Sequence, residues 1–139
     1  MKTYLYYIGK ARDAHANAMA EEYIKRSHRF AHCEMREIQP RRFDPFTKHA
    51  SALKILLDPA GRALDSAAFV KLVEKAERDG RDLVLVVGGA EGLPAAWRPK
   101  ADLLLAISPM TMPHELARVV LAEQIYRAFT TLRGHPYPR

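Results

Sequence analysis

The sequence predicts an α/β fold, a mostly parallel sheet with helices on both faces, from three observations. Short apolar segments typical of strands alternate with longer segments of helical periodicity along all 139 residues. Two of these apolar segments, Leu83–Val87 and Leu103–Ile107, are unbroken, as in strands buried on both faces. Finally, the chain length fits one domain, residues 1–139, and no linker divides it.

The first half of the chain predicts three strands and one helix. Tyr4–Ile8 is expected to form a buried first strand, and a helix from about Asp13 to Arg29 follows it. Cys33–Ile38 alternates apolar and charged residues, which indicates a half-exposed edge strand. Leu53–Leu57 is the next predicted strand, and it is expected to stop at the turn Asp58–Gly61.

The second half predicts two helices around the two unbroken apolar strands. One helix starts near Asp65 or Ser66, which are good capping residues, and ends at Gly80. The last helix runs to about Leu132, and Pro113 fits its first turn, where a missing N–H costs little.

Three loops follow predicted strands, at the edge of a parallel sheet where ligands bind. They are Asp58–Gly61, Gly88–Gly92 and Ser108–Pro113. The glycines of the second loop allow positive φ and a close approach to a ligand, although a tight turn without a ligand explains them equally. Their spacing matches neither the dinucleotide fingerprint nor a Walker loop, and no Lys-Ser or Lys-Thr follows. This argues against phosphate binding and leaves an adenosine ligand open.

Other candidate residues have both functional and structural explanations. His114, in the first turn of the last helix, is either a catalyst or a polar residue at a helix start. His28, His32 and Cys33 are too few for a tetrahedral metal site, so no metal is expected. The tail from Arg133 combines basic and aromatic residues, which suit either RNA contact or a frayed terminus.

The net charge of +6 and the pI of about 9.6 favour a polyanionic partner, although a basic protein without one remains an alternative. No segment is long enough to span a bilayer, and the apolar run after Met1 is too short for a signal peptide. With one cysteine, the chain forms no internal disulfide. We therefore expect a cytoplasmic protein without membrane contact.

The motifs in the second half resemble those of the RlmH family of SPOUT methyltransferases, which methylate nitrogen 3 of a pseudouridine in 23S rRNA. The matching segments are Val87–Leu93, Ser108–His114, Arg118–Ala128 and His135–Tyr137, with looser matches at Tyr7–Lys10 and Leu57–Gly61. Two features differ from the family pattern. The segment between the second and third strands is shorter, and Pro138 stands where the family has histidine.

The resemblance implies a SPOUT-type fold with a C-terminal trefoil knot, a homodimer, S-adenosylmethionine (SAM) as cofactor and 23S rRNA of the assembled ribosome as substrate. It places three residues near the RNA as catalytic candidates: His114, Tyr137 and Arg139. It implies cofactor contacts from Leu57, Gly88, Gly89, Gly92, Ile107, Ser108, Pro109, Met110, Thr111 and Met112.

Three alternatives remain at this point. The chain is another SPOUT-class RNA methyltransferase with a different target nucleotide, a non-catalytic ribosome-binding module, or an ordinary nucleotide-binding α/β protein. The binding module predicts no saturable SAM site, and the nucleotide-binding protein predicts a preference for a phosphorylated nucleotide.

Overall fold

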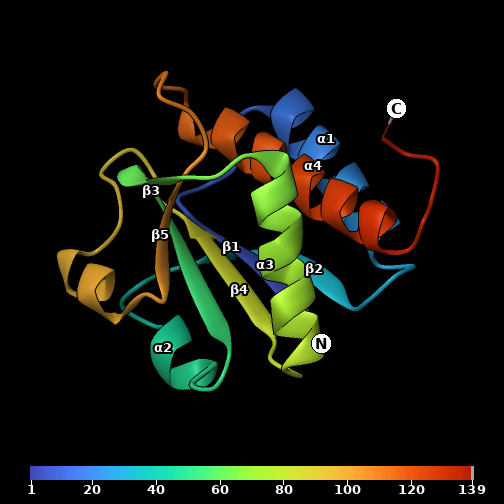
Figure 1. The fold of residues 1–139 in the computed structure, drawn as a ribbon. Coiled ribbons are helices and arrows are strands. Elements are labelled where there is room, and N and C mark those ends of the chain that lie inside the picture. Colours follow the sequence, from blue (N-terminus) through green and yellow to red (C-terminus); the bar gives the residue numbers. More distant parts are fainter. Residues whose placement is uncertain (139) are drawn as a thin grey trace.

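The computed structural model describes residues 1–138, which contain a five-stranded sheet whose neighbouring strands are all parallel. The strand order is β2-β1-β4-β3-β5 (Figure 1). The strands are β1 (Thr3–Ile8), β2 (Cys33–Ile38), β3 (Leu53–Ala63), β4 (Leu83–Val87) and β5 (Leu103–Ala106). The predicted parallel sheet is confirmed, and the carboxyl ends of all five strands meet at one edge.

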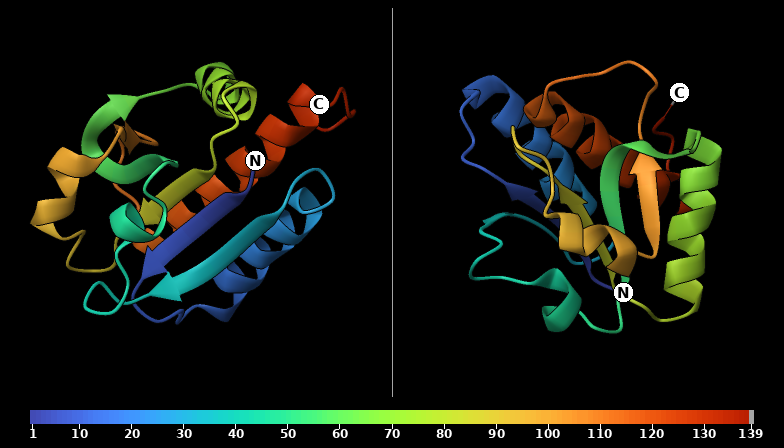
Figure 2. Two further views of the ribbon diagram at one scale, coloured as in Figure 1. Left: turned by 90° about the horizontal axis from the view of Figure 1, so that it is seen from below. Right: turned by 90° about the vertical axis from the view of Figure 1, so that its left-hand side faces the viewer.

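The long helices all cover one face of the sheet (Figures 1 and 2). They are α1 (Ala14–Ser27), α3 (Ser66–Arg78) and α4 (His114–Leu132). The other face carries α2 (Pro45–Lys48) and the short 3₁₀ helix η1 (Ala95–Lys100), neither of which the sequence predicted. Helices therefore lie on both faces, as predicted, but unequally.

Strand β4 lies at the centre of both core layers, and all five of its side chains are buried. Leu83, Leu85 and Val87 pack against the long helices. Val84 and Val86 point to the other face, where they pack with Trp97 of η1. This confirms the prediction, from an unbroken apolar run, of a strand covered on both faces.

The predicted helix starts are confirmed by their caps. The Asp13 carboxylate accepts hydrogen bonds from the backbone N–H groups of His15 and Ala16, at 3.0 and 3.1 Å. The Asp65 carboxylate accepts one from Ala68 at 2.8 Å. These bonds satisfy N–H groups that have no partner within the first helical turn.

Three expectations about strand and helix ends were wrong. β3 does not stop at Leu57: a register shift between Leu57 and Arg62 lets it pair again with β5, so Asp58–Gly61 is a bulge inside the strand. β5 is a half-buried edge strand at its start rather than a fully buried one, since it has one neighbour. Pro113 is the N-cap of α4, not part of its first turn.

Helix α4 is buried on several sides because it packs against both α1 and α3. Within residues 1–138, no helix combines the length and apolar character needed to cross a bilayer.

Candidate functional site

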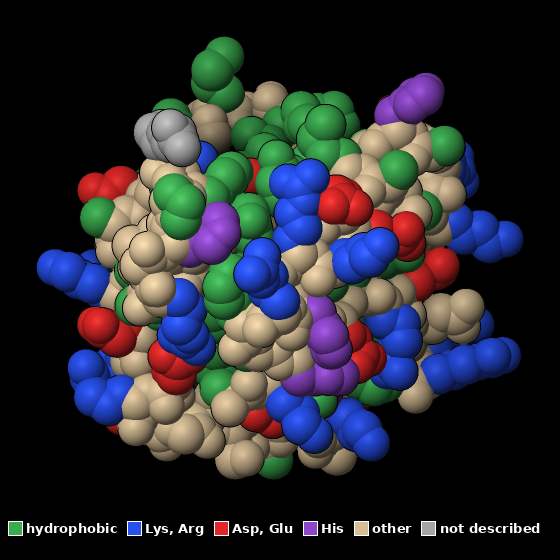
Figure 3. Space-filling model, turned by 90° about the vertical axis from the view of Figure 1, so that its right-hand side faces the viewer, with side chains coloured by type: hydrophobic (Ala, Val, Ile, Leu, Met, Phe, Trp, Pro, Cys, Tyr) green, Lys and Arg blue, Asp and Glu red, His purple; other side chains and the backbone are tan. Residues whose placement is uncertain are grey.

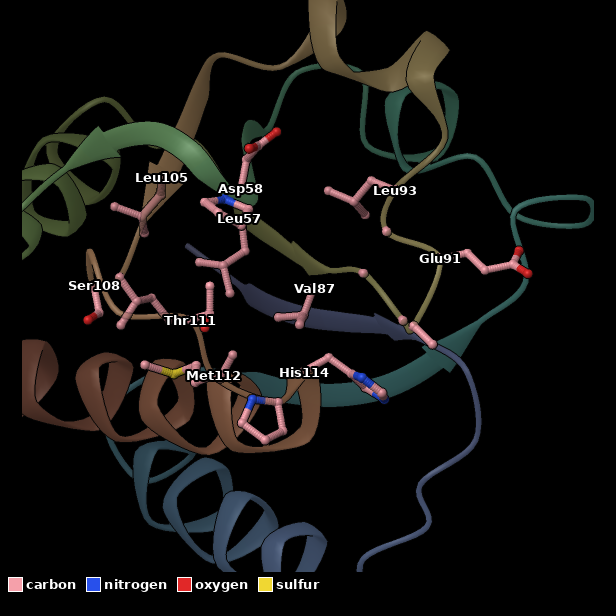
Figure 4. Close-up of a pocket in the computed structure, with 18 of the residues that line it drawn as sticks. Leu57, Asp58, Val87, Glu91, Leu93, Leu105, Ser108, Thr111, Met112 and His114 are labelled. Carbon is pink, nitrogen blue, oxygen red and sulfur yellow. The ribbon is translucent and has the colours of Figure 1, made fainter.

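A cavity of about 630 Å³ opens at the carboxyl edge of the sheet (Figure 4). This volume is typical of small-molecule sites, which span about 300–1,000 Å³. The β3 bulge, the glycine turn after β4, the loop after β5 and the start of α4 line it. All ten residues expected to contact a cofactor are in its lining: Leu57, Gly88, Gly89, Gly92, Ile107, Ser108, Pro109, Met110, Thr111 and Met112.

The glycine turn forms one wall of the cavity and is folded tightly on itself. A Cβ atom at Gly88 would lie 2.8 Å from the carbonyl carbon of Gly92, and one at Gly89 would lie 2.8 Å from the Ile8 oxygen. Gly92 has a φ of +79°, which favours glycine. The turn therefore requires glycines for its own geometry, whether or not a ligand binds, and exposes backbone to the cavity at these positions.

The β3 bulge contributes a charged pair that sequence reasoning missed. The largely buried Asp58 carboxylate accepts a 2.8 Å hydrogen bond from the Ala60 N–H and pairs with the Arg98 guanidinium of η1 at 2.9 Å. The only signal for this pair in the sequence was an acidic residue after a strand, since Arg98 lies 40 positions away in a segment read as a loop.

The loop after β5 forms the opposite wall. The Ser108 hydroxyl accepts a 2.9 Å hydrogen bond from the Met110 N–H, which folds the loop back toward the sheet. The Thr111 side chain is exposed and lines the cavity. Half-buried His114 lies in the first turn of α4, as predicted, and also lines the cavity (Figure 4).

Hydrogen bonds join the start of α4 to the segment that follows β1. The Glu115 carboxylate accepts hydrogen bonds from the backbone N–H groups of Arg12 and Asp13, at 2.5 and 2.9 Å. These two bonds lower the pKa of Glu115. One turn further along α4, the buried Arg118 guanidinium lies over the Tyr7 ring, 3.8 Å from its centroid. Sequence reasoning predicted neither contact.

Tyr137 follows α4 in the chain and folds back against the middle of this helix. Its hydroxyl donates a hydrogen bond to Glu123, and its ring centroid is 4.8 Å from that of Tyr126. Burial and then the Glu123 contact raise the pKa of Tyr137. Glu123 also pairs with Arg127, one turn further along α4, at 2.9 Å.

A single chain does not bring the catalytic candidates together. Nine residues of α4 separate His114 from Glu123, the hydrogen-bond partner of Tyr137, a rise of about 14 Å at about 1.5 Å per residue. Among the residues that the structure describes, Tyr137 does not line the cavity. The third candidate, Arg139, lies outside the described residues.

The His28 and His32 region contains ordinary polar contacts. The Cys33 N–H donates to Nδ1 of His28 at 3.2 Å, and Nε2 of His32 lies 3.1 Å from the Glu34 carboxylate. Burial raises the pKa of the Cys33 thiol to about 12, which keeps it protonated. Between Met1 and Pro138, no group of three or more His, Cys, Asp or Glu residues is placed to hold a metal ion.

Curated relatives resemble this chain closely. The ribosomal RNA large subunit methyltransferase H of Solibacter usitatus is 61% identical over 139 residues, which is 100% of both chains. The protein of the same name from Sorangium cellulosum is 41% identical over 136 residues and 94% of each chain. That of Thioalkalivibrio sulfidiphilus matches at 51% over 87 residues, 63% of this chain and 56% of its own length.

Solved structures resemble the fold at low sequence identity. A probable methyltransferase from Bordetella pertussis has a TM-score of 0.63 at 13% identity, covering 92% of this chain and 94% of its own. A probable methylase family protein from Haemophilus influenzae has a TM-score of 0.64 at 9% identity, covering 99% and 70%. Residues 1–138 match the family described as "Predicted SPOUT methyltransferase". The chain therefore belongs to the SPOUT methyltransferase family, in the group that shares the RlmH motifs.

Proposed function

We propose that this chain transfers a methyl group from SAM to nitrogen 3 of a pseudouridine in 23S rRNA of the assembled ribosome. The observation that carries the proposal is the convergence of the three motif-bearing segments on one cavity. The names of the full-length relatives support an rRNA substrate. The family resemblance supplies the target atom and the ribosomal context.

The lining of the cavity suits SAM better than a phosphorylated nucleotide. Leu57, Val87 and Leu105 offer apolar surface for an adenine ring, and the glycine turn offers backbone groups. The one Lys or Arg in the described lining, Arg98, is paired with Asp58 and is not free to bind phosphate.

When bound, SAM supplies an electrophilic methyl group on its sulfonium sulfur. The two walls of the cavity would hold that group in line with the acceptor nitrogen, and this alignment is the main contribution of the protein. The acceptor nitrogen must also release a proton. His114 lies at the cavity beside the glycine turn, where it is placed to receive that proton or to orient the base.

A homodimer accounts for the distance between His114 and Tyr137. On a twofold axis, the tail of one copy reaches the cavity of the other. Met19 of α1 and Leu116 of α4 are large exposed apolar residues, which a contact with a second copy would cover. Figure 3 views the molecule from the side where the tail lies in Figure 1, and hydrophobic side chains gather there among Lys and Arg.

The remaining parts of the proposal come from the family resemblance. They are a C-terminal trefoil knot, a single domain over residues 1–139 and a cytoplasmic location, where ribosomes are available.

The test uses Thr111→Trp, which fills the cavity from an exposed position, with Thr131→Trp as its control. Thr131 is exposed like Thr111, but it lies near the C-terminal end of α4, far from the cavity. We expect calorimetric titration with SAM to show saturable binding for the parent and Thr131→Trp, and none for a folded Thr111→Trp. Methyl transfer to ribosomes should follow the same pattern, with the methyl group mapped to a pseudouridine.

Other outcomes identify the alternatives. A folded parent that binds ribosomes but shows no saturable SAM binding would be a non-catalytic binding module. A methyl group on another nucleotide would give a different SPOUT-class target. Tighter binding of ATP than of S-adenosylhomocysteine would indicate an ordinary nucleotide-binding protein. Equal methylation of naked rRNA and ribosomes would refute the ribosomal context.

A further inference from the structure

We infer that the loops after β1 and β2 form a basic track that binds the phosphates of the rRNA strand leading to the cavity. The inference rests on the proposed function and specifies its RNA-binding surface. The track consists of Lys10 and Arg12 in the loop after β1, and Arg41 and Arg42 in the loop after β2.

The sheet places these loops next to each other and next to the cavity. Ile8 pairs with Ile38 at the ends of β1 and β2, and β1 also pairs with β4, which ends in the glycine turn. At about 4.8 Å per strand, both loops begin within about 10 Å of that turn. The two strands and their loops extend past Glu91 and His114, away from Ser108 (Figure 4).

The two loops share the same arrangement of charge. Each carries two exposed basic residues followed by an aspartate that caps the next helix. Asp13 accepts hydrogen bonds from backbone N–H groups of α1, and Asp44 accepts one from Phe46. Within the described residues neither carboxylate forms an ion pair with the basic side chains of its loop, and each loop keeps a net positive charge.

The four basic side chains are available for an external anion. Within residues 1–138, none of them takes part in an ion pair. By contrast, Arg127 and Arg133 at the far end of α4 are paired with glutamates. Phosphate oxygens are the anions that exposed Lys and Arg side chains bind on RNA.

Contacts with the rest of the protein hold both loops in place before any ligand binds. Glu115 accepts two backbone N–H groups at the end of the first loop. In the second, the N–H groups of Arg42 and Phe43 both donate to the Gln39 carbonyl at 2.9 Å. The Phe43 ring then packs 5.0 Å from that of Tyr6, between ring centroids. A preorganised loop loses less conformational entropy on binding.

An RNA backbone fits this surface better than an anionic membrane. Membrane-binding segments combine basic residues with large apolar side chains that enter the bilayer. The large exposed apolar residues of the described chain are Met19, Met110 and Leu116, all outside the two loops.

The experiment compares Lys10→Ala/Arg12→Ala and Arg41→Ala/Arg42→Ala with a control, Lys71→Ala/Arg78→Ala. The control removes the same charge from α3, where both residues are exposed and unpaired in the part of the chain that the structure describes. Alanine at position 12 keeps the backbone N–H that Glu115 binds. Binding to assembled ribosomes lacking the methyl group is measured across a range of salt concentrations, with calorimetric SAM titration of each variant.

Each phosphate contact contributes about 0.7 to the slope of log K against log salt for single-stranded RNA. We expect each track variant to lower the slope by about 1.4, so that its affinity falls about sevenfold less than that of the parent between about 50 and 200 mM salt. SAM affinity should equal that of the parent. The control should keep the parental slope.

Track variants with the slope and affinity of the control would overturn the inference, provided that the parent methylates ribosomes. A parent that neither binds nor methylates ribosomes would remove the proposed function, and the inference with it. If the track variants bind ribosomes normally but lose binding to phosphatidylserine vesicles, the surface is a membrane site and the inference is wrong.

Discussion

Replacing Gly61 by alanine tests whether the bulge in β3 sets the shape of the cavity. An added Cβ would lie 2.5 Å from the Leu104 oxygen and 2.9 Å from the Leu105 nitrogen. Because ordinary contact begins at 3.4 Å, β3 and β5 would have to separate by about 0.9 Å. The opposing atoms are backbone, so no side-chain rotation can relieve the clash.

Overpacking of this kind costs about 1–3 kcal/mol, and we expect Gly61→Ala at the upper end, about 2–3 kcal/mol. The entropy of unfolding scales to about 290 cal/mol/K for a chain of this length, so Tm should fall by about 7–10 °C. Since β5 leads directly into the loop that carries Ser108 and Thr111, we also expect SAM to bind about tenfold more weakly, a loss of about 1.4 kcal/mol.

Gly80→Ala provides the control. A Cβ there meets nothing within 4 Å, but its φ of +65° makes alanine unfavourable by about 1 kcal/mol. Gly80 precedes β4, at the end of the sheet where the strands begin and away from the cavity. Its replacement should therefore lower Tm and leave SAM affinity unchanged. Thermal melts measure Tm, and calorimetric titration measures SAM affinity. A Gly61→Ala protein with parental Tm and parental SAM affinity would show that the bulge adapts and does not shape the cavity.

Two further predictions concern the start of α4. The pKa of Glu115 is lowered in the folded state, so the ionised carboxylate stabilises the fold fully above about pH 4.5, and this stabilisation is lost as the pH falls through the folded pKa. The difference in Tm between the parent and Glu115→Gln should therefore shrink in acid. A difference that does not change with pH would contradict this. Buried Arg118 donates one hydrogen bond, 3.0 Å to Asn17, and its Nε lacks a partner among the described residues. In urea denaturation, Arg118→Ala should lower the free energy of unfolding by about 2–5 kcal/mol because it leaves a cavity. Arg118→Met fills the same space, and its free energy of unfolding should stay within about 1 kcal/mol of the parent. Equal losses in the two variants would mean that the charge itself stabilises the fold.

The features that sequence reasoning located correctly depend on local patterns. β4 appears as five apolar residues in a row because both its faces are buried, and the starts of α1 and α3 appear because Asp13 and Asp65 act as caps. That the three loops meet follows from parallel strands alone, since their carboxyl ends share one edge. The cavity was predictable to this extent, down to the residues of its two main walls.

The features that sequence reasoning missed depend on contacts between distant segments. The bulge in β3 exists because β5 pairs with it twice, and nothing near Asp58 in the sequence signals that pairing. Helix α2 has four residues, too few to show a helical period, and η1 contains Pro99, which reads as a loop. For the same reason Arg98 was not recognised as the partner of Asp58, although the two charges are 2.9 Å apart.

The unequal faces of the sheet and the position of the cavity have a common origin in the handedness of the crossovers. The connections β1-α1-β2 and β3-α3-β4 both step toward the β2 edge, whereas β2-α2-β3 and β4-η1-β5 step toward the β5 edge. Right-handed crossovers in opposite directions lie on opposite faces, so both long connecting helices share one face and both short ones share the other. The chain therefore leaves β4 toward the face of η1 and leaves β5 toward the face of α4. Because these two segments diverge from neighbouring parts of the same edge, they cannot fill the space between them, and this space is the cavity.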